Sequence, residues 1–193
     1  GIQNLTLADV DYAESWGGVI KLIGRVKMLD SGKIQIIRCP MFIDRDSQLA
    51  NVDDVFNGIL VRGDATGDVV FYGKGAGKLP TASAVVADVI DCVKHIKARK
   101  YLFWEDGSPD YVEDYLEDVL PMYVRATAEN ASVALGTADA PFGGVQQLSR
   151  KDAPRNELAF VTKEMKEREI REKLEQLSKM GVKVETTVRV ADL

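Results

Sequence analysis

Residues Tyr72–Asp91 read YGKGAGKLPTASAVVADVID, and this segment decides how the chain is interpreted. Its glycines, Gly73, Gly75 and Gly77, permit backbone conformations that a Cβ atom would block. Pro80 suits the first turn of a helix, where its missing N–H breaks no hydrogen bond. The N–H groups and dipole of such a helix can bind an anion, for example a phosphate. A glycine turn before a helix also serves as plain punctuation, so both interpretations stay open on these residues alone.

The residues around this segment predict an α+β arrangement, a mixed sheet with helices on one face. Thr6 predicts the N-cap of a helix that ends at Gly17-Gly18. The strongest helix is expected over Pro80–Arg99, because its apolar residues recur at steps of three and four. Alternating and β-branched residues predict two hairpins, with the strands Val19–Leu29, Lys33–Met41, Val55–Arg62 and Asp68–Tyr72.

A second pattern begins after an acidic stretch, Glu105–Asp118, which holds seven carboxylates. Carboxylates can bind a divalent cation, but their spacing does not match an EF-hand loop, so an acidic linker is the favoured interpretation. We therefore predict domains over residues 1–104 and 121–193, joined by a linker over residues 105–120. The second domain is expected to contain, in order, the strands Met122–Ala128, Val145–Lys151 and Glu157–Thr162, the helix Lys163–Gly181 and the strand Val182–Val190.

Composition narrows the class of protein further. The 193 residues are 46% hydrophobic, which is enough for a core, and carry a net charge of −5. This charge argues against nucleic acid or an anionic membrane as a partner, and no apolar run is long enough to span a bilayer. Cys39 and Cys92 have no partner at metal-binding spacing, so we predict no metal site and reduced thiols, as in a cytoplasmic protein.

The first half of the chain resembles homoserine dehydrogenase. The GAG-x-x-PTASAVVAD block is the specific part of the resemblance, and the other marks are individually weak. These are Asp9 and Ala13 before Gly17, the run Ile20–Ile23, Pro40, Leu49–Val52, Phe56–Ile59 and Gly63-Asp64. One departure is Gly58, where the family usually has alanine.

The resemblance implies an oxidoreductase that moves a hydride between NAD or NADP and L-homoserine or L-aspartate 4-semialdehyde. It assigns cofactor binding to Gly77, with Gly75 and Ala76 shaping the approach. The family's dinucleotide turn, G-x-G-x-x-G after a strand, does not occur here. The family's catalytic residues correspond to none of these positions and would lie upstream. We therefore expect a C-terminal piece of a longer enzyme that is inactive alone and forms a homodimer or higher oligomer.

The last part of the chain resembles the ACT fold, a βαββαβ unit that can sense an amino acid. Where that fold usually has an Asp-x-Pro-Gly turn, this chain has Glu129–Gly136, reading ENASVALG. The first helix is accordingly expected to be short or broken, which puts effector binding in doubt. An alternative function is a non-catalytic module for amino-acid sensing or dimerisation, but such a module has no use for the GAG-x-x-PTASAVVAD block.

A few single residues allow two interpretations each. His95 is the only histidine and lies four residues after Asp91, so a surface pair is expected rather than a metal or triad residue. Lys21 lies within a strand pattern and fits an edge lysine better than a catalytic one. Lys74 and Lys78 flank the glycine turn and either pair with a phosphate or solvate the loop.

Overall fold

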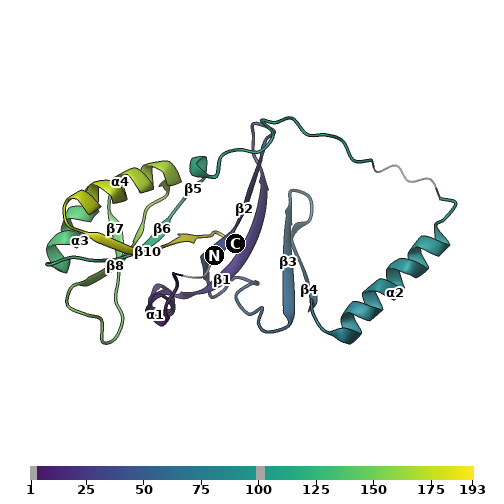
Figure 1. The fold of residues 1–193 in the computed structure, drawn as a ribbon, viewed down its shortest axis with the longest axis horizontal. Coiled ribbons are helices and arrows are strands. Elements are labelled where there is room, and N and C mark those ends of the chain that lie inside the picture. The colour runs from purple at the N-terminus through teal and green to yellow at the C-terminus, as the bar shows by residue number, and fades with distance from the viewer. Residues whose placement is uncertain (1–3, 99–102) are drawn as a thin grey trace. The chain divides into compact units, whose positions relative to one another are not determined.

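The computed structural model describes residues 4–98 and 103–193 (Figure 1). They divide into two compact units, one formed by residues up to Ala50 together with Ser108–Leu193, the other by Asn51–Gly107. This division differs from the predicted boundaries, because the first fifty residues share a sheet with the C-terminal part of the chain. Within the described residues, no helix is long and apolar enough to cross a membrane.

The larger unit is built on one mixed sheet of six strands. All neighbouring strands are antiparallel except β2 and β10. These two run parallel, with Met41 opposite Arg189 and Phe42 opposite Val190. The strands in spatial order are β1 (Gly18–Met28), β2 (Ile34–Asp44), β10 (Lys183–Val190), β6 (Met122–Thr127), β8 (Glu157–Thr162) and β7 (Val145–Leu148). A two-stranded pair of β5 (Val119–Leu120) with β9 (Met165–Lys166) lies outside this sheet.

The C-terminal strands and helices follow the predicted order, β6-α3-β7-β8-α4-β10, with α3 at Ala131–Asp139 and α4 at Glu167–Lys179. The helix α3 is continuous over nine residues, so it is short, as one of the two expectations had it, but not broken. The side chain of Asn130 caps it by accepting a hydrogen bond from the N–H of Val133 at 3.1 Å. A 3-10 helix, η1, covers Tyr115–Glu117 just before β5.

Helices cover both faces of the sheet, whereas the sequence predicted helices on one face. Successive residues of a strand point to opposite faces, and β6 divides accordingly: Val124 lies in a core with Phe160 and Ile170, towards α3 and α4. Tyr123 lies in a second core with Tyr12 of α1 (Leu7–Trp16) and Phe42 of β2. A third core holds Ile23, Met41, Ile43, Ala50 and Ala191.

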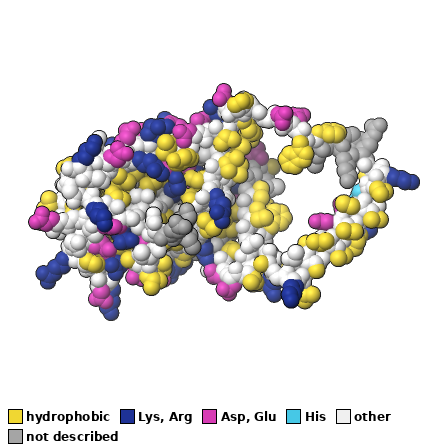
Figure 2. Space-filling view, viewed as in Figure 1, with side chains coloured by type: hydrophobic (Ala, Val, Ile, Leu, Met, Phe, Trp, Pro, Cys, Tyr) yellow, Lys and Arg dark blue, Asp and Glu magenta, His cyan; other side chains and the backbone are white. Residues whose placement is uncertain are grey.

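The smaller unit consists of the hairpin β3 (Phe56–Gly63) and β4 (Gly67–Lys74), followed by the helix α2 (Lys78–Lys94). This helix confirms the predicted one but begins two residues before Pro80 and ends at Lys94, before the predicted end at Arg99, which itself lies outside the described residues. No residue of α2 is buried, and Figure 2 shows hydrophobic side chains gathered along it. Its exposed apolar face is typical of a helix that packs against another surface.

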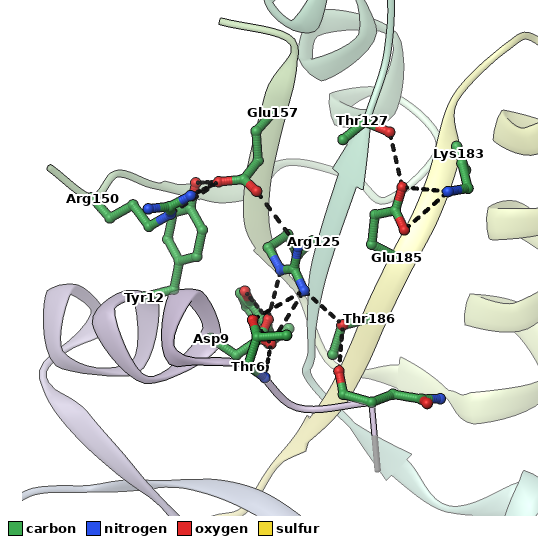
Figure 3. Close-up of polar contacts among 12 residues, drawn as sticks. Thr6, Asp9, Tyr12, Arg125, Thr127, Arg150, Glu157, Lys183, Glu185 and Thr186 are labelled. Atoms are coloured by element: carbon green, nitrogen blue, oxygen red, sulfur yellow. Dashed lines mark hydrogen bonds and ion pairs between the residues drawn. The ribbon is translucent and has the colours of Figure 1, made fainter. Parts of the chain in front are cut away.

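A buried ion pair fixes α1 to the sheet of the larger unit (Figure 3). The carboxylate of Asp9, fully inaccessible to solvent, accepts hydrogen bonds from Nε of Arg125 at 2.7 Å and from the hydroxyl of Tyr123 at 2.9 Å. It also accepts from the backbone N–H of Thr6 at 2.8 Å and from its hydroxyl at 2.9 Å. A buried charge is tolerated when it is paired and hydrogen-bonded in this way.

A second carboxylate extends the same network across the sheet. Glu157 of β8 accepts hydrogen bonds from the hydroxyl of Tyr12 at 3.0 Å and from Nε of Arg150 at 2.9 Å. Arg125 reaches Glu157 through Nη1 at 3.5 Å and the hydroxyl of Thr186 through Nη2 at 3.1 Å (Figure 3). The network therefore joins α1 to three strands, β6, β8 and β10.

The environment of Asp9 makes the stability of the larger unit depend on pH. Burial by itself raises the pKa of Asp9, but the hydrogen bonds from Arg125, Thr6 and Tyr123 outweigh it and hold this pKa below its usual value. A carboxyl group whose pKa is lower in the folded state stabilises that state above its unfolded pKa. This stabilisation is lost as the pH falls through the folded pKa.

Asp9→Asn is expected to lower the free energy of unfolding at pH 7 by about 3 kcal/mol, because Arg125 loses its charged partner in a buried site. The wild-type free energy of unfolding should also fall as the pH drops below about 4, and the variant should lack that part of the fall. Urea unfolding at several pH values measures both effects.

Asp11→Asn is the matched control, since Asp11 is exposed on the same helix. It should leave the stability and its pH dependence close to wild type. Equal destabilisation by the two substitutions would contradict a special role of the Asp9 carboxylate.

Candidate functional site

The predicted cofactor-binding residues lie together in the turn between β4 and α2. Gly75 follows the end of β4, and its N–H donates to the carbonyl of Val55 at 3.0 Å. Gly77 is the N-cap residue of α2, and its carbonyl accepts the N–H of Thr81 at 3.1 Å. Ala76 lies exposed between them. The structure therefore brings the three predicted residues into one tight, solvent-accessible turn.

Two glycines of this turn have separate structural reasons to lack a side chain. Gly77 has φ 120° and ψ 153°, a conformation that is essentially restricted to glycine. At Gly75 an added Cβ would lie 1.8 Å from Nδ2 of Asn57 and 2.4 Å from its Cγ, so Asn57 would have to move. Gly73 is different, because a Cβ there meets no atom within 4 Å.

The geometry of the turn suits an approaching anionic group. No side chain caps the N-terminus of α2 in the described part of the chain, so N–H groups of its first turn remain available, with the positive end of the helix dipole. Lys74 and Lys78 flank the turn and are both exposed. These features fit the phosphate or the nicotinamide half of a dinucleotide, because backbone can come close where Gly75 and Gly77 have no side chains.

The other predicted residues have ordinary structural partners. His95 pairs with Asp91 through Nδ1 at 3.0 Å on the surface of α2, which confirms the expected surface pair. Lys21 lies half-buried in β1 opposite Met41. In the acidic stretch, four carboxylates form ion pairs: Glu113 with Lys33, Asp114 with Arg168, Glu117 with Lys166 and Arg168, and Asp118 with Arg25.

Sequence reasoning missed clusters of buried charge in the larger unit, two of which are extensive. One contains Asp9, Arg125 and Glu157; the other places the buried Glu167 between Arg171 and Arg189. Asp9 and Arg125 are 116 positions apart, so no local spacing connects them. The available signal was Glu167 with Arg171, an i,i+4 pair on a predicted helix.

Comparison with known proteins finds relatives for the first half of the chain. The family model described as homoserine dehydrogenase matches residues 1–90. A homoserine dehydrogenase from Pseudomonas aeruginosa is 46% identical over 94 residues, which cover 49% of this chain and 21% of that protein. One from Synechocystis is 47% identical over 96 residues, covering 48% of this chain and 22% of the relative. The matched region thus spans about a fifth of these relatives.

Solved structures extend the likeness to the whole chain. A homoserine dehydrogenase from Thiobacillus denitrificans matches with a TM-score of 0.79 at 28% identity, over 100% of this chain and 47% of that one. The enzyme from S. aureus matches with a TM-score of 0.73 at 29% identity and the same coverage. Residues 1–90, which include the glycine turn, thus match the homoserine dehydrogenase family model, and the whole chain resembles solved homoserine dehydrogenases.

Proposed function

We propose that this chain forms part of an NAD(P)-dependent homoserine dehydrogenase, an oxidoreductase that interconverts L-homoserine and L-aspartate 4-semialdehyde. The observation that carries the proposal is the match of residues 1–90 to that family. The whole-chain likeness to solved homoserine dehydrogenases supports it. Such an activity serves the biosynthesis of threonine and methionine.

In this proposal the turn at Gly75–Gly77 contributes backbone to the nicotinamide nucleotide. The cofactor, when bound, supplies the hydride chemistry. The chain's own share is to let backbone approach the nucleotide at Gly77, to offer the first-turn N–H groups of α2 to an anionic group, and to add the charges of Lys74 and Lys78. The groups that bind homoserine and move its proton are assigned to none of the 193 residues, so the chain alone is proposed to be inactive.

Gly77→Val, introduced into a full-length enzyme that contains this segment, is expected to raise the KM for the nucleotide at least about tenfold. The branched side chain would fill the space in which the cofactor is proposed to contact the protein backbone at Gly77. It should also lower the stability, since the conformation of Gly77 costs any other residue about 1–3 kcal/mol. Steady-state kinetics and thermal unfolding separate the two effects.

Gly73→Ala is the control, because the added methyl group at this position meets open space and both measurements should stay near wild type. An unchanged nucleotide KM in a folded Gly77→Val enzyme would contradict the cofactor role.

The 193-residue chain, assayed alone with homoserine and NAD or NADP, should give no turnover.

A second candidate function is amino-acid sensing by the C-terminal part. The order β6-α3-β7-β8-α4-β10 with the spatial order β10-β6-β8-β7 matches a ferredoxin-like βαββαβ unit, and we propose that it is of the ACT type. Against strong effector binding, Oδ1 of Asn130 is occupied in capping α3, and the loop before it carries no Pro-Gly turn.

L-Threonine is accordingly expected to bind this chain only weakly, with a Kd above about 1 mM. Isothermal titration calorimetry with threonine and, separately, methionine provides the measurement. A Kd below about 1 mM, together with NMR chemical-shift changes at residues 123–144 on addition of the amino acid, would overturn this expectation and favour the sensing function.

A homodimer is proposed on the basis of the β1–β2 hairpin. Residues directly opposite in an antiparallel pair share a face of the sheet, and one such face carries exposed apolar side chains. They are Leu22, which is 50% exposed, Val26 (69%), Met28 (64%) and Ile36 (50%). β1 is also an edge strand of the sheet, and exposed apolar edges are normally covered by pairing.

Val26→Lys is expected to shift the chain from dimer to monomer, because a two-fold interface would place a charge from each copy on an apolar surface. Light scattering at concentrations on the order of tens of micromolar reports the mass. Val133→Lys, at an exposed valine of α3, a helix that packs on β7 and β8, should remain dimeric. A monomeric wild-type chain would rule the dimer out.

A further inference from the structure

A pocket lies where β10 separates from β2. The two strands pair only at Arg189 and Val190 of β10, and the preceding residue of β2, Pro40, has no N–H to donate to a neighbour. β10 also has an irregular register against β6 between Val184 and Thr186, and such bulges bend a strand. The resulting pocket of about 270 Å³ is lined by Cys39, Pro40, Glu167, Arg171 and β10 residues 184–189, among others.

Two guanidinium groups in this pocket share one carboxylate. Glu167, fully buried at the start of α4, accepts hydrogen bonds from Nε of Arg189 at 2.7 Å and from Nη2 of Arg171 at 2.6 Å. Both guanidinium groups also lie over the ring of Tyr115, 5.8 Å from its centroid for Arg171 and 5.7 Å for Arg189. One negative charge is therefore held against two positive charges.

Neighbouring acidic groups are engaged elsewhere in the described part of the chain. Glu185 lines the pocket too, but its carboxylate pairs with Nζ of Lys183 at 2.9 Å and accepts from the hydroxyl of Thr127 at 3.1 Å. Asp118 accepts the N–H of Glu167 only through its backbone carbonyl. Three nearby carboxylates pair outside the pocket: Asp118 with Arg25, and Asp114 and Glu117 with Arg168. An excess of positive charge remains at Arg171 and Arg189.

We propose that this pocket binds a small oxyanion, a carboxylate or a phosphate, through Arg171 and Arg189. The planar guanidinium group donates in a fork that matches both kinds of anion. Arg171 is the more accessible of the two, with 52% of its side chain exposed against 16% for Arg189, and each uses only part of its N–H donors on Glu167. The ligand would touch β2 on one side and β10 and α4 on the other, and would stabilise their contact.

Titration of the 193-residue chain with inorganic phosphate at constant ionic strength tests the proposal. Calorimetry should show saturable binding with a Kd of about 1 mM or lower, and the melting temperature should rise because only the folded chain has the pocket. A parallel titration with succinate shows whether the site prefers a carboxylate or a phosphate. Saturable binding of either anion supports the proposal.

Two variants connect the binding to the pocket. Arg171→Gln should weaken it at least about tenfold. Arg168→Gln is the matched control, since Arg168 lies three positions earlier on α4, is 47% exposed and pairs with Asp114 and Glu117 outside the pocket; it should bind as wild type does. If Arg171→Gln does not fold, Arg171→Lys, which keeps the charge but loses the fork, should bind several-fold more weakly. Absence of saturable binding of both anions, or equal weakening by Arg168→Gln, would overturn the proposal.

Discussion

The ion pair between Asp9 and Arg125 is the constraint on which the larger unit depends. Each buried ion loses several kcal/mol of hydration on leaving water, so Asp9 is tolerated only with all its partners in place. Those partners come from the turn before α1 and from β6. The helix therefore has one position on the sheet in which its charge is satisfied. Aromatic rings pack around that position. The ring centroid of Tyr123 lies 4.4 Å from that of Phe42, on which it stacks, and 6.0 Å from that of Tyr12.

Two charged clusters lie near a narrow junction in the sheet. β2 and β10 pair at only two positions, yet this pairing joins the segment that matches the homoserine dehydrogenase model to the C-terminal strands. The Asp9 network holds α1 against β6, β8 and β10. The Glu167 cluster holds the start of α4 to β10. A ladder of two residue pairs contributes few hydrogen bonds, and the Asp9 network adds side-chain contacts between the N-terminal segment and the C-terminal strands.

The smaller unit, unlike the larger one, is held by local contacts. Its hairpin is held by local pairing from Phe56–Lys74 to Gly63–Gly67, and α2 buries none of its apolar residues. This is also the unit that carries the glycine turn proposed to approach the nucleotide. A turn with bare backbone and an uncapped helix start contributes little to stability on its own. The glycine turn and the apolar face of α2 can contribute to binding when a ligand or another protein surface covers them.

The amino-acid sequence was enough to predict the local elements and the resemblance of the first half to homoserine dehydrogenase. Alternating residues predicted every strand of the main sheet to within a few residues, and the segment from Gly73 to Pro80 predicted both the turn and the start of α2, because these signals depend on near neighbours. The tertiary structure alone decided which segments share a sheet, that α1 covers the face opposite α3 and α4, and that Asp9 meets Arg125. Such contacts join residues more than a hundred positions apart, and no periodicity in a single sequence records them. The requirement for glycine at position 77 divides in the same way: the sequence marked the residue, and its φ of 120° supplied the physical reason.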